Sequence, residues 1–554
     1  MTTWADAGRL VQILTADALD ILRPQRKHLA QRRAQWGQPG QGEGLFAQRY
    51  FDRVRQQAPD RHVDDKTWDD LEFPALFAHM DTTQTAPGRQ VLYHRLRTPL
   101  ADAAVLASRH AAAQRLRDDP LLRECIQRRL LRLEGDGSED LADDLFGDPP
   151  TPGRHYGWLI AWAVVALAIL ALVWPLGLPA WLFVPVLGVN WLVSMAGTLG
   201  KRQQIEALTN SLTLAAVADQ LATLRGQHDA LPSLQALVHE APARRAFRRA
   251  LGRFRLVFSL DAAQVPVVAQ AANLVKSLLL IDVLVCGHAI RRFGTVRDKL
   301  RASFVLVGEI DASIAVASWL VQQRVHCRPT LAADASLMIE GGVHPLIAEG
   351  VSNTMAPGQR SALVTGSNMA GKTTFIKMLG MNVILGRTLG ICTACAATLP
   401  AARVMASIHN RHSVGSGKSH YFAEVEAIAG FLARATPDNP HLFLIDEPFS
   451  GTNTVERIAI ARAVLEALGR HARVFVTTHD VELQALLGDG YGLYHFQEDP
   501  NVEGFFDYRL RAGATREHNA IALLDRIGFP APVVAAALCY AGVNAGDEVV
   551  VSVD

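Results

Sequence analysis

A long stretch without a charged side chain constrains this chain more than any other feature of its sequence. No Asp, Glu, Lys, Arg or His occurs between Tyr156 and Gly200. The stretch holds two apolar runs joined by PLGLPA, and each run is about as long as a helix that crosses a bilayer, ~20 residues. Arg154 precedes the first run, and Lys201 and Arg202 follow the second. Because basic residues flank the same side of a tight hairpin, the sequence predicts a transmembrane hairpin with both ends in the cytoplasm.

The two runs have one alternative interpretation, a buried helical hairpin in the core of a water-soluble protein. Two consecutive uncharged runs of this length argue against it. Tryptophans cluster near the ends of the runs, as anchors at the membrane interface do; they are Trp158, Trp162, Trp174, Trp181 and Trp191. We therefore expect a multi-pass protein of the inner (cytoplasmic) membrane that contacts the bilayer through residues 157–200.

Other segments are expected to lie outside the bilayer. The segment from Pro266 to Ile290 is also apolar, but Lys276 and Asp282 within it predict a buried helix of the water-soluble part. The N-terminus has neither the basic region nor the apolar core of a signal peptide, so none is expected.

Cysteine usage and charge narrow the classes of protein. Six cysteines in 554 residues do not make a disulfide framework and fit a reducing, cytosolic compartment. Cys392 and Cys395 have C-x-x-C spacing, but no second pair completes a zinc ribbon, and two small buried residues are favoured over a redox role. The net charge of +1, from 55 basic and 54 acidic residues, means that any basic surface must be local.

The pattern of residues divides the chain into five segments. A helical region, 1–150, precedes the hairpin segment, 151–203, and helical patterning returns over 204–335. Within 336–516, strand-like runs such as SALVT, HLFLID and RVFVTT alternate with helical runs, which predicts an α/β domain with a largely parallel sheet. A helical segment, 517–554, ends the chain.

A basic stripe is expected on a helix in the third segment. Arg244 and Arg248 are four residues apart, as are Arg245 and Arg249, and this spacing puts each pair on one side of a helix. Such a stripe, extending to Arg255, is suited to DNA or to anionic lipid head groups, and a merely solvated face is the alternative.

A glycine-rich loop in the fourth segment matches the phosphate-loop pattern G-x-x-x-x-G-K-[ST] without exception. Its glycines let successive backbone N–H groups point at phosphate oxygens, and the following helix adds its positive N-terminal end. The predicted nucleotide-binding residues are Gly366, Ser367, Asn368, Met369, Ala370, Gly371, Lys372, Thr373 and Thr374. Lys372 is expected to contact the β- and γ-phosphates of ATP, and the Thr373 hydroxyl is expected to bind Mg²⁺.

Two later strands end in residues that complete such a site. HLFLIDE ends in Asp446, predicted to hold Mg²⁺ through its water shell, and Glu447, predicted to orient and polarise the attacking water. RVFVTTHD places His479 at a strand end, where it can contact the γ-phosphate. Lys372, Glu447 and His479 are therefore the candidate catalytic residues.

A second anion site is predicted where SGKSHYFAE opens a helix, at Gly417 and Ser419. Because the first loop already holds the phosphates of its own subunit, this one is expected to act in trans on the nucleotide of a neighbouring subunit. A homodimer is therefore expected.

These elements, in this order, resemble the MutS branch of the ABC-type ATPases. GSNMAGKTT is similar to the family's G-P-N-M-G-G-K-S-T, IDEPFSGTNT to its D-E-x-x-x-G-T-S-T, TTHDVEL to its T-H-x-x-E-L, and SGKSHYFAEV to its S-x-x-x-F-x-x-E signature. Outside these motifs, residues 80–100 resemble the family's helical core motif, GEIDASIAVASWL its returning lever helix, and HNAIALLDRIGFPAPVVAAA its C-terminal dimerisation segment. The resemblance implies an α/β P-loop ATPase domain of MutS/ABC type, preceded by an all-α lever/core domain that the transmembrane hairpin interrupts.

The chain departs from the family pattern in three respects. The core motif starts within the first hundred residues, so no place is left for the mismatch-reading and connector domains. The hairpin stands where the DNA-gripping clamp normally lies between the lever segments. The signature's usual threonine is His420, and no aromatic residue for stacking adenine is evident near Asn353.

The resemblance implies an ATP-binding and ATP-hydrolysing dimer, similar to a DNA damage sensor, with DNA as the ligand inherited from a mismatch-repair family but with a membrane anchor. The alternative is a membrane-tethered ATPase switch that acts on a protein or membrane partner without mismatch recognition. A transporter-like motor ranks last, because two spans per subunit enclose little room for a substrate path.

Overall fold

The computed structural model divides the chain into two compact units. The helical unit contains residues 1–62, 77–98 and 104–322, and the sheet unit contains residues 63–76, 99–103 and 323–554. The structure describes residues 28–40, 44, 46–134, 138–148, 156–173, 181, 183–199, 202–224, 231–252, 280–334, 336–358, 360–367, 369–408, 420–437, 440–487, 490–498, 506–514, 524 and 528–540.

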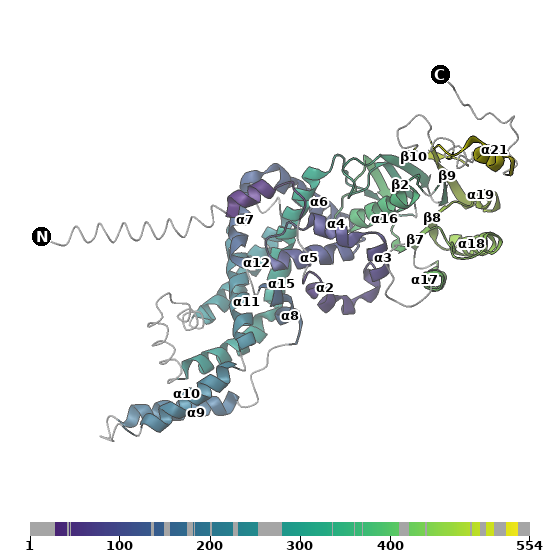
Figure 1. The fold of residues 1–554 in the computed structure, drawn as a ribbon. Helices are drawn as coiled ribbons and strands as arrows, with labels where there is room; N and C mark the ends of the chain where they lie inside the picture. The colour runs from purple at the N-terminus through teal and green to yellow at the C-terminus, as the bar shows by residue number, and fades with distance from the viewer. Residues whose placement is uncertain are drawn as a thin grey trace. The chain divides into compact units, whose positions relative to one another are not determined.

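The helical unit is built around one long helix, α15 (Ile281–Gln322), as Figure 1 shows. Other helices of this unit among the described residues include α2 (Arg49–Val54), α5 (Ala86–Arg97), α6 (Ala103–Asp118), α7 (Pro120–Leu130), α8 (Leu141–Phe146), α9 (Tyr156–Val173), α10 (Phe183–Leu199), α11 (Arg202–Leu221) and α12 (Pro232–Ala250). Short 3-10 turns lie at Arg55–Gln57, Pro59–Arg61, Leu131–Leu133 and Ser138–Asp140. The boundary between the two units falls within α4 (Phe73–Met80).

The crossing of α5 over α15 depends on small residues on both helices. A Cβ atom on Gly308 would lie 2.5 Å from Val91, and one on Gly88 would lie 2.1 Å from the carboxylate of Asp311. Asp311 is fully buried and accepts hydrogen bonds from the backbone N–H of Thr85, at 2.8 Å, and from its hydroxyl, at 2.7 Å. The Thr85 hydroxyl also accepts from the backbone N–H of Gly88, so it caps the N-terminus of α5. The glycines therefore let the two helices approach each other closely, and one buried carboxylate links them.

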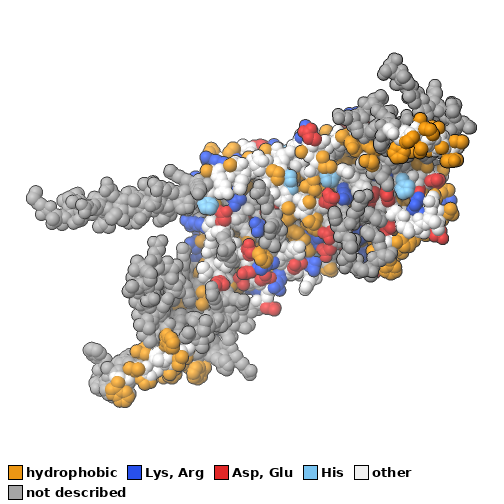
Figure 2. All heavy atoms as spheres, viewed as in Figure 1, with side chains coloured by type: hydrophobic (Ala, Val, Ile, Leu, Met, Phe, Trp, Pro, Cys, Tyr) orange, Lys and Arg blue, Asp and Glu red, His pale blue; other side chains and the backbone are white. Residues whose placement is uncertain are grey.

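Helices α9 and α10 lie within the stretch without charges. The Trp162 indole donates a 2.9 Å hydrogen bond to the side-chain oxygen of Asn190, which is buried between the two helices. Large apolar side chains are exposed on both helices (Figure 2), among them Trp158, Val164, Val165, Val184, Trp191 and Leu192. Exposed apolar surfaces are in general typical of interaction sites.

A search by length and hydropathy over the described residues finds one helix able to cross a membrane. It is His288–Gln322 within α15, and 78% of its most apolar window is buried inside the protein. Such burial is equally typical of a core helix in a water-soluble protein. Val184–Val193 and Ala531–Tyr540 are shorter apolar helices.

The sheet unit contains two sheets. The smaller one has the order β1 (Thr330–Leu331), β5 (Ala396–Leu399), β2 (Leu337–Gly342) and β3 (Asn353–Gly358). The larger one has the order β10 (Phe506–Ala512), β9 (Tyr491–Glu498), β4 (Ser361–Thr365), β8 (Arg473–Thr478), β7 (His441–Asp446) and β6 (Arg403–Ser407). All its neighbouring strands are parallel except β10, which is antiparallel to β9. The interior strands β4 and β7 are buried along their whole length, as strands covered on both faces are.

Helices pack against this larger sheet. They include α16 (Lys372–Thr388), α17 (His420–Arg434), α18 (Thr454–Gly469) and α19 (Glu482–Leu486), and α21 (Ala531–Tyr540) follows near the C-terminus. Phe443, Leu465 and Val476 belong to one buried cluster that joins α17, α18 and α19 to the sheet. A helical N-terminal region followed by a mixed α/β region confirms the coarse fold prediction.

A helix from the early part of the chain completes the sheet unit. α3 (Asp65–Asp70) lies beside β6, the edge strand of the larger sheet. The backbone N–H of Ala406 donates a 3.0 Å hydrogen bond to the Thr67 hydroxyl, and that of Ile408 donates a 2.8 Å bond to Asp70. These side chains satisfy donors that an open sheet edge would leave unpaired.

Two predictions on smaller features had different outcomes. Cys392 is buried as predicted, but Cys395 is exposed, and a Cβ atom on the facing Gly341 would lie 2.7 Å from its sulfur. Most of the helix predicted from Pro266 to Ile290 lies outside the described residues, and the part from Leu280 onward leads into α15.

Candidate functional site

The glycine-rich loop connects β4 to α16 at the carboxyl end of the larger sheet. Its first and last glycines, Gly366 and Gly371, have φ angles of +142° and +95°, which favour glycine. A Cβ atom on Gly366 would also lie 2.8 Å from the backbone oxygen of Phe496. Because α16 begins at Lys372, the free N–H groups at its N-terminus and its positive dipole end face the loop.

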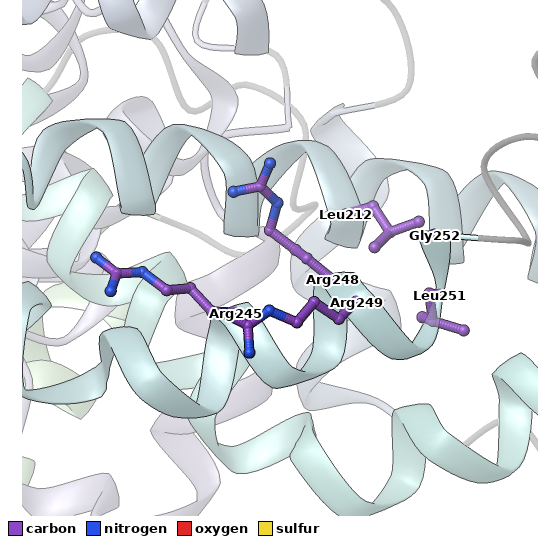
Figure 3. Close-up of a pocket in the computed structure, with 6 residues that line it drawn as sticks. All are labelled: Leu212, Arg245, Arg248, Arg249, Leu251 and Gly252. Carbon is purple, nitrogen blue, oxygen red and sulfur yellow. The ribbon is translucent and has the colours of Figure 1, made fainter.

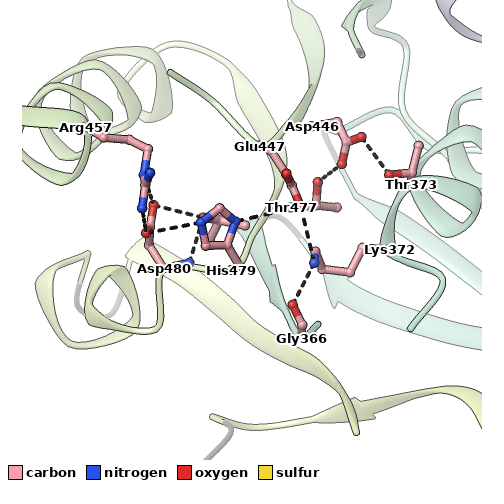
Figure 4. Close-up of polar contacts among 10 residues, drawn as sticks. Gly366, Lys372, Thr373, Asp446, Glu447, Arg457, Thr477, His479 and Asp480 are labelled. Carbon is pink, nitrogen blue, oxygen red and sulfur yellow. Dashed lines mark hydrogen bonds and ion pairs between the residues drawn. The ribbon is translucent and has the colours of Figure 1, made fainter. Parts of the chain in front are cut away.

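Lys372 is buried and held by oxygen atoms on two sides (Figure 4). Its Nζ donates a 2.6 Å hydrogen bond to the backbone oxygen of Gly366 and lies 3.5 Å from the carboxylate of Glu447. Burial lowers the pKa of Lys372 below its usual value, and the carboxylates of Glu447 and Asp446 oppose this shift. An ammonium group held this way can exchange the carbonyl oxygen for a phosphate oxygen at little cost in solvation.

Thr373 and Asp446 are directly linked. The Thr373 hydroxyl donates a 2.7 Å hydrogen bond to one oxygen of Asp446, and the hydroxyl of Thr477 donates to the other oxygen. Asp446 ends β7 and Thr477 lies on the adjacent β8, where the two residues are paired in register. The fold therefore positions this carboxylate from two sides, next to the first turn of α16.

Glu447 and His479 face each other beyond the strand ends. Glu447 has a φ of +49°, an unusual value for a residue with a side chain, and its backbone N–H bonds to the Thr477 oxygen at 2.9 Å. Nδ1 of His479 lies 3.8 Å from the Glu447 carboxylate. The strained backbone turns the Glu447 side chain toward both Lys372 and His479 (Figure 4).

One ion pair and one hydrogen bond to a backbone N–H, which sequence reasoning missed, support these positions. Arg457 on α18 donates two hydrogen bonds to Asp480, at 2.9 and 2.5 Å, next to His479. Glu424 on α17 accepts a 2.7 Å hydrogen bond from the backbone N–H of Phe449, whose φ is +61°. Glu424 is the last residue of the SGKSHYFAE segment, and its carboxylate holds the loop after β7.

An aromatic residue lies beside the loop, contrary to the prediction that none is near Asn353. A Cβ atom built on Gly371 would lie 3.2 Å from the ring of Tyr508, which is half-exposed on β10. The Asn353 side chain donates to the Tyr508 backbone oxygen at 3.0 Å and accepts from the Leu510 N–H at 2.7 Å. Sequence reasoning missed Tyr508 because more than 130 residues separate it from the loop, and nothing local signals their contact.

The remaining predicted residues fall into two groups. Ser367, Met369, Ala370 and Thr374 lie in or next to the loop, and the buried Ser367 hydroxyl has no hydrogen-bond partner within the part of the chain that the structure describes. Asn368 and both residues of the trans signature, Gly417 and Ser419, lie outside the described residues.

The predicted basic stripe does not form one exposed face. Arg244 is buried, and it pairs with Asp219 at 3.1 Å and donates to the Leu237 oxygen at 2.6 Å. Arg245, Arg248 and Arg249 remain at or near the surface, whereas Arg255 lies outside the described residues. Pairing of Arg244 with a carboxylate 25 positions earlier in the chain removes it from contact with any large partner.

Comparison with known proteins relates this site to one family of ATPase domains. Residues 362–541 match the family model of MutS domain V. The chain is 27% identical over 499 residues to the DNA mismatch repair protein MutS of Thermus aquaticus, covering 83% of this chain and 60% of that protein. It is 30% identical over 258 residues to the DNA mismatch repair protein MutS 2 of Halobacterium salinarum (strain ATCC 700922 / JCM 11081 / NRC-1), covering 44% and 29% of the two chains.

A third relative is the DNA mismatch repair protein MutS of Chloroflexus aurantiacus (strain ATCC 29366 / DSM 635 / J-10-fl), 29% identical over 255 residues. That match covers 43% of this chain and 26% of the relative. The matches with these MutS proteins thus span between 26% and 60% of the relatives' own length. Together with the domain V match, which falls within the sheet unit, they support a relationship to the MutS family.

Proposed function

We propose that the sheet unit is an ATPase that binds Mg²⁺–ATP in the loop between β4 and α16 and hydrolyses its γ-phosphate. The observation that carries this proposal is the 2.7 Å bond between the Thr373 hydroxyl and Asp446, beside the buried Lys372. A hydroxyl at a helix N-terminus, a strand-end carboxylate and a buried ammonium are the groups that phosphoryl transfer needs together. The match to MutS domain V supports the same assignment.

The residues of the loop fit a triphosphate. Backbone N–H groups between Gly366 and Lys372 would bind phosphate oxygens, and the hydroxyl of Ser367 offers a donor that the described residues do not use. Lys372 would transfer its hydrogen bond from the Gly366 oxygen to the β- and γ-phosphates. The loop therefore supplies positive charge and donors without a large rearrangement of the backbone.

The donor set also fits Mg²⁺. The Thr373 hydroxyl and the Asp446 carboxylate are hard oxygen ligands, and Mg²⁺ is usually held by one or two such groups together with water and substrate phosphates. Across the described residues, no cluster of three or more His, Cys, Asp and Glu side chains offers an all-protein metal cage. When bound, the ion would neutralise charge on the β- and γ-phosphate oxygens.

Glu447 would act as the residue that orients the attacking water and accepts its proton. Its carboxylate lies within reach of Lys372 and near His479, so it projects into the space next to the γ-phosphate position. His479 directly precedes Asp480, which is fixed by its ion pair with Arg457. Its imidazole N–H would donate a hydrogen bond to a γ-phosphate oxygen. The ring of Tyr508, next to Gly371, would stack on the adenine base.

Dimerisation and membrane anchoring are further parts of the proposal. Gly417 and Ser419 would contact the nucleotide of a second subunit, and the apolar side chains exposed on α21, such as Val533 and Tyr540, support a contact between C-terminal segments 517–554. Helices α9 and α10, with their exposed apolar surface and uncharged sequence, would span the bilayer over residues 157–200. The ATPase domain would then lie on the cytoplasmic side of the inner membrane.

DNA is the ligand that the relatives' names suggest, because each is named a DNA mismatch repair protein. We propose duplex DNA as a ligand of the helical unit, with an ATPase switch that acts on a protein or membrane partner as the alternative. Burial of Arg244 favours the alternative, because it leaves fewer exposed arginines on α12 that could contact DNA phosphates. A gel shift at rising salt separates the two, because phosphate contacts lose affinity steeply with salt.

Calorimetry with Mg²⁺–ATP on the detergent-purified full chain tests the core of the proposal. Wild-type protein should bind ATP, and the Lys372→Ala variant should not. A folded wild-type protein that shows no heat of binding would refute the ATPase assignment. Alkaline carbonate extraction of the membrane fraction tests the anchor independently, since an integral hairpin resists extraction.

A further inference from the structure

A hollow on the helical unit is lined by three arginines and lies far from the loop after β4 in sequence. It has a volume of about 340 Å³ and lies between α11 and α12. Its lining consists of Leu212, Arg245, Arg248, Arg249, Leu251 and Gly252 (Figure 3). The volume is at the lower end of the range of small-molecule sites, ~300–1,000 Å³.

The hollow carries an excess of positive charge. Asp219 is the nearby carboxylate, and it is already paired with the buried Arg244 at 3.1 Å and with Arg248 at 2.9 Å. Neither Arg245 nor Arg249 has a hydrogen-bonded or ion-paired carboxylate among the described residues. Since like charges repel, a group of arginines on one turn of a helix is stabilised by an anion between them.

The shape and chemistry of the lining suit a phosphate group. Guanidinium groups donate pairs of parallel hydrogen bonds that match phosphate oxygens, and each such charge-assisted bond is stronger than a neutral one. Leu212 and Leu251 add an apolar wall beside the arginines, as Figure 3 shows. A concave site with one charged and one apolar side suits a phosphate esterified to a small organic group better than it suits the convex backbone of a duplex.

The connection of α11 to the hairpin indicates where such an anion could come from. α10 ends at Leu199 and α11 begins at Arg202, so the hairpin leads almost directly into the helix that carries Leu212. Leu212 lies ten residues further along α11, ~15 Å from its start at 1.5 Å per residue. The hollow is therefore lined in part by the helix that directly follows the hairpin.

We propose that this hollow binds the phosphate of an anionic phospholipid head group, through Arg245, Arg248 and Arg249. The shared chemistry is a phosphate ester, and a free organic phosphate is the other source that could supply it. The assignment to a lipid rests on the membrane anchoring proposed above, whereas binding of a phosphate ester does not. Occupation of the site would fix α12 against α11 at the base of the hairpin.

The test uses the full chain purified in a neutral detergent, so that insertion of the hairpin does not contribute to the signal. Short-chain phosphatidylglycerol, glycerol phosphate and short-chain phosphatidylcholine are titrated separately and followed by native mass spectrometry and calorimetry. The test variant is Arg245→Gln/Arg249→Gln, because these side chains are exposed and do not hold α12 in place. The matched control is Arg291→Gln/Arg292→Gln, which removes the same charge from an exposed surface of α15.

Wild-type and control proteins should bind phosphatidylglycerol and not phosphatidylcholine. The test variant should bind phosphatidylglycerol about tenfold more weakly or worse, because two charge-assisted hydrogen bonds are lost. Equal binding of glycerol phosphate would overturn the lipid assignment and leave a phosphate-ester site. Equal losses in test and control variants, or no binding of either phosphate, would overturn the proposal entirely. In the duplex DNA gel shift proposed above, a loss of DNA binding alone in the test variant would assign the arginines to nucleic acid and overturn the proposal.

The same samples separate this proposal from the anchoring proposal. Both variants should remain in the carbonate-resistant membrane fraction, because neither changes residues 157–200. If wild-type protein is extracted by carbonate but still binds glycerol phosphate, the anchor is wrong and the phosphate-ester site stands.

Discussion

Lys377 on α16 donates a 2.7 Å hydrogen bond to Glu72, a residue of the short segment between α3 and α4. The same helix carries Lys372 and Thr373 at its N-terminus. On this helix, Gly380 also leaves no room for a side chain, because a Cβ atom there would lie 2.5 Å from Leu444 and 2.8 Å from Leu71. The helix that follows the phosphate loop is therefore held on one side by residues 71 and 72, far upstream in the chain.

This relationship predicts a measurable coupling between Glu72 and Lys377. Glu72→Gln and Lys377→Met should each lower the free energy of unfolding, and the double variant should lose less than the sum of both. The coupling energy should be about 0.5–1 kcal/mol, because Glu72 is partly exposed. Urea unfolding of the four proteins measures it. The exposed pair Arg324–Glu349, 3.2 Å apart, is the control and should show coupling near zero; equal coupling in both pairs would contradict the special role of Glu72.

Replacement of Glu447 tests its assignment as the residue that activates water. Glu447→Gln keeps the shape of the side chain but cannot accept a proton, so turnover should fall about 10²-fold or more while ATP binding is retained. Steady-state phosphate release and ATP calorimetry measure the two effects. Glu466→Gln, on an exposed pair of α18 with Arg462, is the control and should hydrolyse ATP at the wild-type rate. Normal turnover by Glu447→Gln would assign proton transfer to another group.

Tyr508 provides a test of base recognition. Tyr508→Ala should weaken ATP binding by about tenfold, the size expected for loss of one stacking contact, whereas Tyr508→Phe should bind as the wild type does. Inorganic triphosphate is the decisive comparison, because it lacks the base. Its affinity should be the same for all three proteins. If Tyr508→Ala weakens binding of both ligands equally, the ring supports the loop at Gly371 and does not stack on adenine.

The parts of this site that could be predicted are those in which neighbouring residues of the sequence determine the local structure. The strand–loop–helix segment around Lys372 and the apolar strand that ends in Asp446 could be identified because glycine spacing and buried strand patterns are local signals. The contacts of Tyr508 with Gly371 and of Glu72 with Lys377 could not, since they depend on how distant segments pack. Arg244 shows the same limit: its helical spacing indicated a basic surface, but its partner Asp219 lies on another helix.

The buried His344 makes stability depend on pH. Burial lowers the pKa of His344 to about 4, whereas the unfolded side chain has a pKa of about 6.5. The folded protein therefore binds fewer protons between these values, so this contribution to stability is complete above pH 6.5 and is lost as the pH falls toward 4. Between pH 7 and pH 5 the free energy of unfolding should fall by about 2 kcal/mol because of His344 alone.

His344→Asn removes the titrating group and should flatten this dependence by about that amount, ~2 kcal/mol, in urea unfolding at the two pH values. His94, whose pKa burial also lowers to about 4, keeps its own share of the pH dependence in the variant. A His344→Asn protein with the full wild-type dependence would show that the imidazole becomes protonated in the folded state near its ordinary pKa.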